Sequence, residues 1–578
     1  MWSITGLGLI LNLFILLGTS TDNNAKVIKT NYGYVRGIVK KTNLNKREVL
    51  KFPNIPYAEP PVGQFRFEKP RPKLAWNGTM NLTEDVIACL QPQQPGFTIT
   101  EDCLVLNVWT PYPQPRNSLT VMVWLHGGAF RIGASGQYDG ANFVALSDVI
   151  LVTINYRLGA LGFLTTPDKR MKANLGLFDQ RLALKWVKEN IKNFGGNSQS
   201  ITLFGESAGG ASVSAHTISK ESLKYYERAI IQSGNMLMPW AIATDKQLSD
   251  SLKWFLGEVE CPDNGVLLEC MKNVSEVKWK QVTNRKNYMN IVMLPYVDGE
   301  FFIDHPQKLW QEKKVPQKDI IIGVTKDEMY LSVQYLLSHS RNISIYLSYF
   351  EKRLEAYFGK NTSKAVYDKA REFYKPACIP SFLEAMKPSI AFESDVMFIC
   401  SSVEEAKLRS NISSNMMNGS NLYLYLYSHV PLVTYETSLY PYGIFEFSTH
   451  GLDVYSVFGW PINNTQFLID DQTLAMRMVL YWTNFARTGN PNLGRTKLPI
   501  VLNNIDSLPK WPKYSSQKQE YLDMGSYSKM SVGTKLRDKH CEFLKDPKAF
   551  LTARSSANKR MISLLVIFCV AISVNKLT

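Results

Sequence analysis

The chain has 578 residues, of which 45% are hydrophobic and 12% aromatic, enough to bury a large core. Its 65 Lys and Arg outnumber 50 Asp and Glu and give a net charge of +15. No long basic run or nucleic-acid motif accompanies that charge, and no spacing suggests a metal or dinucleotide site. The composition therefore predicts a solvated, mildly cationic surface and no nucleic-acid partner.

Residues 1–20 are predicted to be a signal peptide, because the apolar stretch Leu7 to Leu17 precedes the small residues Gly18-Thr19-Ser20. This segment carries no Lys or Arg before its apolar core. A first transmembrane helix is the alternative, but the apolar stretch is short for a helix that spans a membrane. Entry into the secretory pathway, with an extracellular destination, agrees with N-glycosylation motifs at Asn77, Asn81, Asn273, Asn342, Asn361, Asn411, Asn418 and Asn463.

The first half of the chain predicts strands alternating with helices. Residues 52–67 are rich in Pro, Gly and aromatics, which indicates an extended segment with turns. The apolar runs 119–125 and 149–154 are typical of strands covered on both faces of a parallel sheet. Residues 182–194 show an amphipathic helical pattern that Gly195 and Gly196 terminate.

Further buried strands are predicted at 228–231 and 320–324, and residues 422–427 alternate Leu and Tyr. Strands interleaved with helices predict an α/β fold with a large, mostly parallel central sheet flanked by helices and carrying long insertions. No repeat or linker divides the chain, so residues 21–553 are expected to form one domain.

Residues 200–212, SITLFGESAGGAS, hold the most specific local signal. An apolar strand at 201–204 leads through Gly205-Glu206-Ser207-Ala208-Gly209 into a helix-compatible segment. Glycines two positions either side of the serine leave room for a sharp strand-to-helix turn that exposes the hydroxyl. This G-x-S-x-G pattern predicts the nucleophile elbow of an α/β-hydrolase, with Ser207 as nucleophile.

A serine nucleophile needs a base and an orienting acid, which follow it in the order acid, then histidine. His450, in a loop of small residues, and His429, at the end of the Leu/Tyr strand, are the two candidates that the residues alone leave open. Asp327 and Glu328 directly follow a predicted strand, where open α/β sheets place their ligands.

His126-Gly127-Gly128-Ala129-Phe130 follows another buried strand, upstream of the elbow. Backbone with few side chains can direct N–H groups at an oxygen that becomes negative in a tetrahedral intermediate. The N–H of Ala208, directly after the nucleophile, would be the partner donor. The segment therefore predicts an oxyanion hole.

Taken together, these stretches resemble the type-B carboxylesterase/cholinesterase family over nearly all of residues 35–551. The resemblance is closest to carboxylesterases and bile-salt-activated lipase rather than to a true acetylcholinesterase. The segments that carry it are PYAEPPVG (56–63), EDCLVLNVWTP (101–111), HGGAF (126–130), NYRLGALGFL (155–164), NLGLFDQRLALKWV (174–187), ITLFGESAGGASV (201–213), KDE (326–328), HGLDVYSVFG (450–459) and YWTNFARTGNPN (481–492).

The resemblance implies an α/β-hydrolase that works without a cofactor on a small-molecule or lipid ester, with Ser207 as nucleophile, Glu328 as acid and His450 as base. Met329 departs from the family, where many members have glycine after the acid, and this weakens the choice of Glu328 over Asp327. The implied oxyanion donors are Gly128, Ala129 and Ala208.

Eight cysteines are present, and Cys569 lies in the C-terminal apolar tail, so at least one of the other seven stays unpaired. Sequence proximity favours two local pairs, and the resemblance implies three disulfides with Cys378 free. The implied pairs are Cys89–Cys103, Cys261–Cys270 and Cys400–Cys541.

Three features distinguish the chain from cholinesterases, which hold a quaternary ammonium by cation–π contact with a tryptophan in the first disulfide loop. Residues 90–102 contain no Trp, Arg131 stands where a tyrosine is typical, and Leu331 and Ser332 replace an aromatic pair. A serine carboxylesterase is therefore predicted. Cholinesterase activity and a non-catalytic cell-surface adhesion protein of the same fold are the alternatives.

Residues 554–578 are predicted to be a signal for a glycosylphosphatidylinositol (GPI) anchor. The apolar stretch 561–574 is shorter than the roughly 20 residues that a spanning helix needs, and the small residues Ser555-Ser556-Ala557 precede it. A short tail anchor and a buried C-terminal helix are the alternatives. The expected location is the cell surface through this lipid anchor, or the extracellular medium.

Overall fold

The computed structural model describes residues 25–555 except 43, 45–46, 81, 83, 115–117, 338–340, 376–378, 380, 414–418, 432–445, 497–507 and 526–529. The predicted signal peptide, nearly all of the predicted tail, and Cys378, Asn81 and Asn418 lie outside these residues. No helix in the described ranges is long and apolar enough to cross a membrane.

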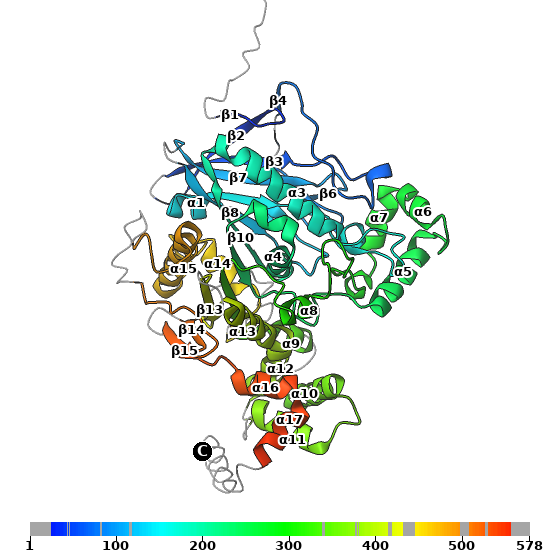
Figure 1. Ribbon diagram of the computed structural model, residues 1–578, viewed down its shortest axis with the longest axis vertical. Coiled ribbons are helices and arrows are strands. Elements are labelled where there is room, and N and C mark those ends of the chain that lie inside the picture. The colour runs from blue at the N-terminus through cyan, green and yellow to red at the C-terminus, as the bar shows by residue number, and fades with distance from the viewer. Residues whose placement is uncertain are drawn as a thin grey trace, which may run out of the picture.

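A large twisted sheet runs through the molecule, from β1 at the top of Figure 1 to β15 below. In spatial order its strands are β1 (Ala25–Lys29), β2 (Tyr34–Lys41), β3 (Glu48–Pro56), β7 (Val105–Tyr112), β9 (Ile150–Ile154), β8 (Leu119–Leu125), β10 (Gly196–Glu206), β11 (Arg228–Gln232), β12 (Asp319–Thr325), β13 (Leu422–Tyr427), β14 (Glu520–Met524) and β15 (Ser531–Thr534). From β9 through β14 neighbouring strands are parallel, and the strands at both ends of the sheet pair antiparallel. The predicted mostly parallel sheet is confirmed.

Two short strands pair apart from this path, β5 (Val86–Ala88) with β6 (Phe97–Ile99), and β4 (Thr79–Met80) pairs with β2. The described helices are α1 (Ala141–Ser147), α2 (Gly159–Phe163), α3 (Leu175–Asn190), α4 (Ala208–Ile218), α5 (Asp245–Val259), α6 (Leu267–Asn273), α7 (Glu276–Thr283), α8 (Pro306–Gln311), α9 (Tyr330–Leu337), α10 (Ile343–Phe358), α11 (Lys364–Tyr374), α12 (Phe382–Ser394), α13 (Cys400–Ser413), α14 (Leu452–Val457), α15 (Ile469–Thr488), α16 (Asp538–Lys545) and α17 (Pro547–Ser555).

The sheet is covered on both faces, as its continuous apolar strands predict. Along β8, Val121 and Val123 pack into one apolar core with residues of α3 and α4, whereas Met122 and Trp124 pack into a second core with α1 and α15. A third, smaller core joins α10, α11 and α16 at the bottom of Figure 1. The parallel strands are thereby held rigidly between two helical layers.

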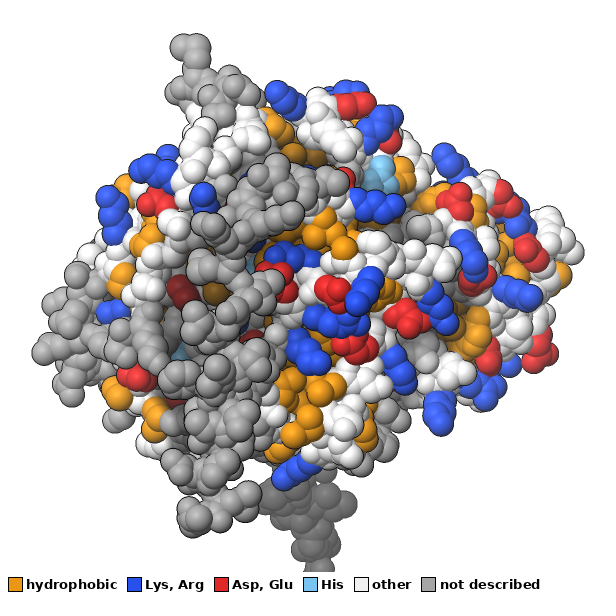
Figure 2. Space-filling view, turned by 90° about the horizontal axis from the view of Figure 1, so that it is seen from below, with side chains coloured by type: hydrophobic (Ala, Val, Ile, Leu, Met, Phe, Trp, Pro, Cys, Tyr) orange, Lys and Arg blue, Asp and Glu red, His pale blue; other side chains and the backbone are white. Residues whose placement is uncertain are grey.

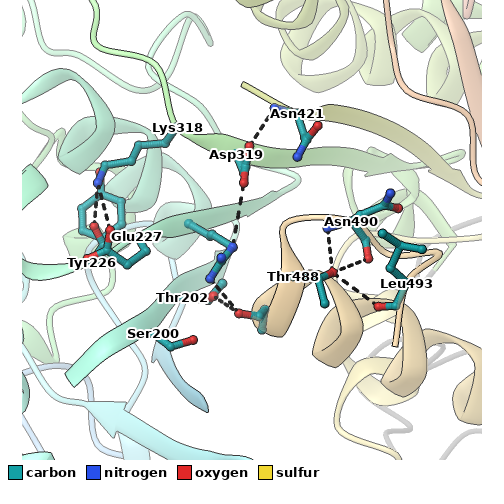
Figure 3. Close-up of polar contacts among 12 residues, drawn as sticks. Ser200, Thr202, Tyr226, Glu227, Lys318, Asp319, Asn421, Thr488, Asn490 and Leu493 are labelled. Carbon is teal, nitrogen blue, oxygen red and sulfur yellow. Dashed lines mark hydrogen bonds and ion pairs between the residues drawn. The ribbon is translucent and has the colours of Figure 1, made fainter. Parts of the chain in front are cut away.

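The amino ends of the central strands are tied to the end of α15 by polar contacts (Figure 3). Arg228 on β11 and Thr202 on β10 both donate to the Ala486 carbonyl, at 3.0 and 3.5 Å, near the last turn of α15. Asp319 on β12 accepts from the Asn421 N–H at 2.7 Å. This edge is a structural joint, and the opposite, carboxyl edge is left for the functional loops.

Figure 2 shows the face that α10, α11 and α16 help to form, where Lys and Arg side chains are interspersed with Asp and Glu. Surface ion pairs there include Lys369–Glu372 on α11 and Lys545–Glu404. Among the described residues of this face, positive charge is therefore balanced locally rather than gathered in a continuous patch.

Candidate active site

Ser207 lies at the apex of a sharp turn between β10 and α4. Its backbone has φ 59° and ψ −126°, a conformation that costs free energy for a non-glycine residue and persists only where the surroundings fix it. The Ser207 N–H donates to the Gln232 carbonyl at 2.9 Å, and its own carbonyl accepts from the Ala211 N–H at 2.8 Å. The backbone is thus fixed on both sides of the predicted nucleophile.

Glycine is required beside this turn because neighbouring backbone comes very close. A Cβ on Gly209 would lie 2.0 Å from the Leu125 carbonyl oxygen, and one on Gly234 would lie 1.9 Å from the Ser207 carbonyl oxygen. Any side chain at these two positions would push the turn out of place.

Glu328 and His450, from loops far apart in sequence, meet next to the elbow. His450 Nδ1 lies 2.5 Å from Glu328 Oε2, and Glu328 Oε1 accepts from the Thr325 N–H at 2.8 Å. The Glu328 carboxylate is fully buried, and the His450 ring packs 4.8 Å from the ring of Phe398. The carboxylate can therefore orient the imidazole and stabilise its protonated form.

The rival residues lie elsewhere. Asp327 accepts from the Ser448 N–H at 3.0 Å, on the loop that leads to His450, and does not contact the imidazole. His429 forms a buried pair with Asp471, with Nε2 and Oδ1 2.6 Å apart. The structure therefore pairs His450 with Glu328 rather than Asp327, and it brings this ring to Glu206, the residue before Ser207, whereas His429 pairs with Asp471.

Glu206 is a site residue that sequence reasoning did not identify. Its Oε1 lies 3.1 Å from His450 Nε2, on the opposite side of the imidazole from Glu328, although the two atoms are not aligned as a hydrogen bond. Its Oε2 would lie 2.9 Å from a Cβ on Gly127, in the predicted oxyanion loop. The one available signal was its place at the end of the strand, directly before the nucleophile.

The imidazole and its two carboxylates form a buried charge cluster. Burial raises the pKa of Glu206 to about 8, an effect that His450 partly offsets. Burial alone would lower the pKa of His450, but the negative charges of Glu206 and Glu328 outweigh it and raise that pKa to about 9. Protonation of His450 and ionisation of Glu206 are therefore coupled.

The predicted oxyanion loop lies against the elbow, since a Cβ on Gly127 would be 2.9 Å from Ser207 Cβ. Ala129 and Phe130 have φ of 55° and 59°, and the Arg131 N–H closes the turn onto the Gly128 carbonyl at 2.9 Å. Within the described ranges, no protein acceptor pairs with the N–H groups of the proposed donors Gly128, Ala129 and Ala208.

Two contacts hold this loop in place. The buried His126 ring stacks on Tyr156 at 4.5 Å, and burial lowers the pKa of His126 to about 4, so this imidazole stays neutral. The Gln91 side-chain amide bonds both backbone groups of Gly133, each at 2.9 Å. Preorganised N–H donors of this kind stabilise a developing oxyanion without reorganisation.

The three disulfides of the structure are the pairs implied by the family resemblance, Cys89–Cys103, Cys261–Cys270 and Cys400–Cys541. The six described sequon asparagines are all exposed: Asn77, Asn273, Asn342, Asn361, Asn411 and Asn463. Over the residues that the structure describes, no group of three or more His, Cys, Asp or Glu is placed to hold a metal ion.

Comparisons with known proteins give the family. The profile of the carboxylesterase family matches residues 24–544. A mouse protein named cholinesterase is 32% identical over 571 residues, which covers 92% of this chain and 89% of the mouse protein. The chain belongs to the carboxylesterase family and is a serine carboxylic-ester hydrolase with the α/β-hydrolase fold.

Proposed function

We propose that the chain cleaves esters through an acyl-enzyme, with Ser207 as nucleophile, His450 as base and Glu328 as the orienting acid. The observation that carries this assignment is the 2.5 Å contact between His450 Nδ1 and buried Glu328, beside the strained elbow. Ser207 Oγ attacks the ester carbonyl while His450 Nε2 accepts its proton. The N–H groups of Gly128, Ala129 and Ala208 stabilise the resulting oxyanion.

Collapse of the tetrahedral intermediate breaks the bond to the alcohol, which leaves with the proton from His450, and the acyl group remains on Ser207. A water molecule then gives a proton to His450 and attacks the acyl carbon. The second collapse releases the carboxylic acid and returns the proton to Ser207 Oγ. Glu328 stays ionised throughout and stabilises the imidazolium in both halves of the reaction.

We assign the substrates to neutral or anionic esters rather than choline esters. The name of the mouse relative makes choline esters the second candidate. Against it, residues 90–102 contain no tryptophan to bind a quaternary ammonium, and the cationic Arg131 directly follows the oxyanion loop. Acyl esters of graded chain length, compared with butyrylcholine, test this, and faster hydrolysis of butyrylcholine would contradict it.

Labelling with a fluorophosphonate probe tests the nucleophile. The wild type should be labelled covalently, and Ser207→Ala should not. Folded wild-type protein that stays unlabelled would support the adhesion alternative instead.

We further propose that the protein is extracellular, N-glycosylated and held at the cell surface by a GPI anchor. Three disulfides and six exposed sequon asparagines support export through an oxidising compartment. Phosphatidylinositol-specific phospholipase C should release the protein from cells, and a glycosidase that removes N-glycans should lower its apparent mass. Protein that stays on the membrane after phospholipase treatment would contradict the anchor.

A further inference from the structure

Arg131 is the residue that ends the oxyanion turn. Its N–H closes a four-residue turn onto the Gly128 carbonyl, and Cα atoms at the two ends of such a turn lie within about 7 Å of each other. The Arg131 side chain therefore starts within one side-chain length of the proposed donors Gly128 and Ala129. The side chain thus begins next to the loop that is proposed to hold the ester oxygen, and its guanidinium bonds the Met289 carbonyl.

The guanidinium of Arg131 is half-buried without a carboxylate partner. Its Nη1 donates to the Met289 carbonyl at 3.0 Å, whereas its Nε is buried and has no acceptor. Among the described residues, no acidic side chain lies within 4.0 Å of it. Burial lowers the pKa of Arg131, and the Tyr288 side chain offsets this only in part.

Three buried arginines of this protein are neutralised by carboxylates. The Nη2 atoms of Arg66, Arg157 and Arg409 lie 2.5, 2.7 and 2.6 Å from the carboxylate oxygens of their acidic partners. An uncompensated charge in a partly dry environment is costly, and an anionic ligand would relieve that cost. Arg131 lacks such a carboxylate, as the half-buried Arg181 and Arg487 do, and it differs from those two in adjoining the proposed oxyanion loop.

We propose that Arg131 is a specificity residue that binds a carboxylate on the ester substrate. The planar guanidinium fork matches a carboxylate and gives a charge-assisted hydrogen bond. Met289, 40% exposed beside it, offers apolar contact for the chain that joins the ester to the carboxylate. The inference rests on the proposed function and narrows its substrates to carboxylate-bearing esters, such as monoesters of dicarboxylic acids.

Two isosteric ester pairs test the proposal with the full protein. The first compares the 4-nitrophenyl monoester of adipic acid with that of its monoamide, which places the charge on the acyl side. The second compares the hexanoate esters of 4-hydroxybenzoate and 4-hydroxybenzamide, which places it on the alcohol side. In at least one pair, Arg131→Gln should lower the ratio of kcat/KM for the charged over the neutral ester by about 10- to 100-fold.

Arg371→Gln is the matched control, because it removes the same charge from α11, where Arg371 pairs with Glu351 at 2.8 Å. It should leave both ratios unchanged. Arg131→Lys should keep part of the preference, since it retains the charge but not the fork. In the wild type, added salt should lower the ratio, a measurement that needs no variant to fold.

The outcomes separate the two proposals. If Arg131→Gln lowers kcat/KM equally for the charged and the neutral esters, the residue has a purely structural role at Met289 and the inference is overturned. The inference would also be overturned if both esters of a pair are hydrolysed but neither Arg131→Gln nor added salt changes the ratio of their kcat/KM values. In that case the proposed function would still stand. Failure to hydrolyse any ester, together with absence of fluorophosphonate labelling, would overturn both.

Discussion

Ser207 and His450 act as one unit if the proposed mechanism holds. Ser207→Ala and His450→Ala should each lower kcat by about 10⁶-fold, and the double variant should lose little more, because each single change already disables the nucleophile. Active-site titration combined with steady-state kinetics measures this. Losses that multiply in the double variant would contradict it.

His429→Ala is the matched control, since His429 is a second buried histidine that pairs with a carboxylate. Removing it leaves Asp471 buried without its partner, which should lower the free energy of unfolding by about 3–5 kcal/mol. Its kcat per folded molecule should stay near the wild-type value. A large loss of kcat in this variant would reopen the choice of base.

Glu206 should set the acid side of the pH–rate profile. The reaction needs neutral His450, so kcat/KM rises with pH as this residue loses its proton. Since the charge of Glu206 helps to raise the pKa of His450 to about 9, Glu206→Gln should lower that pKa. The acid limb of kcat/KM should then move to lower pH, by about one unit or more.

Asp327→Asn provides the comparison, because Asp327 lies beside Glu328 in sequence but bonds the Ser448 N–H instead of the imidazole. Its acid limb should stay at the wild-type position. An unchanged limb in Glu206→Gln would show that Glu206 does not control the charge state of His450.

At the scale of single residues, the motif was enough to propose Ser207 as the nucleophile. Residue type alone could not choose the acid between two adjacent carboxylates. Asp327 and Glu328 are adjacent acids in the same loop, and only their different directions in space separate them. Glu206 went unidentified because its role depends on a 3.1 Å approach from a loop more than two hundred residues away.

Among the elements, the turn between β10 and α4 depends most on glycine, because neighbouring backbone leaves no room for a side chain there. Gly209→Ala places a Cβ 2.0 Å from the Leu125 carbonyl oxygen, which belongs to a buried central strand and cannot move cheaply. We expect a loss of about 1–3 kcal/mol in the free energy of unfolding, together with lost fluorophosphonate labelling. Chemical denaturation and labelling of the same sample check both effects.

Gly257→Ala is the control for that substitution. Gly257 lies inside α5, and nothing lies within 4 Å of the position of its Cβ. Alanine there should stabilise the protein by about 0.5–1 kcal/mol, because glycine is the poorer helix former. A destabilised Gly257→Ala, or an unaffected Gly209→Ala, would contradict the role given to close backbone approach.

Helix α3 shows why the start of a helix could not be predicted correctly from the sequence. The amphipathic pattern predicts a helix from residue 182, but α3 begins at Leu175. Its first turns are buried on every side and include Gly176 and the ion-paired Asp179, so they show no polar face. The pattern of an amphipathic helix cannot appear where tertiary packing covers the whole helix.

For the whole molecule, the order of strands and helices along the chain was enough to predict the parallel sheet, and the proposed site residues lie at one edge of it. Ser207 follows β10, Glu328 follows β12, and the oxyanion loop follows β8, all at the carboxyl ends of parallel strands. The contacts that the C-terminal part of the described chain makes with distant residues could not be predicted from local sequence patterns. Arg537, for example, bonds Asp395 at 2.9 Å across 142 residues.

The same long-range closure predicts how the disulfides rank in stability. Cys400–Cys541 joins residues 141 apart, whereas Cys261–Cys270 joins residues 9 apart. In the chain-entropy picture the longer loop contributes about 5 kcal/mol and the shorter about 2.6 kcal/mol, because the cross-link restricts more of the unfolded chain.

Replacing both cysteines of a pair by serine should therefore lower the free energy of unfolding more for Cys400–Cys541 than for Cys261–Cys270. Denaturant unfolding of the oxidised proteins measures the difference. The long disulfide also fastens α16 to α13, which follows directly on the segment whose Phe398 packs against His450. Its loss should thus reduce kcat as well as stability, whereas loss of the short disulfide should affect stability alone. Equal effects of the two pairs on kcat would show that this packing does not reach the imidazole.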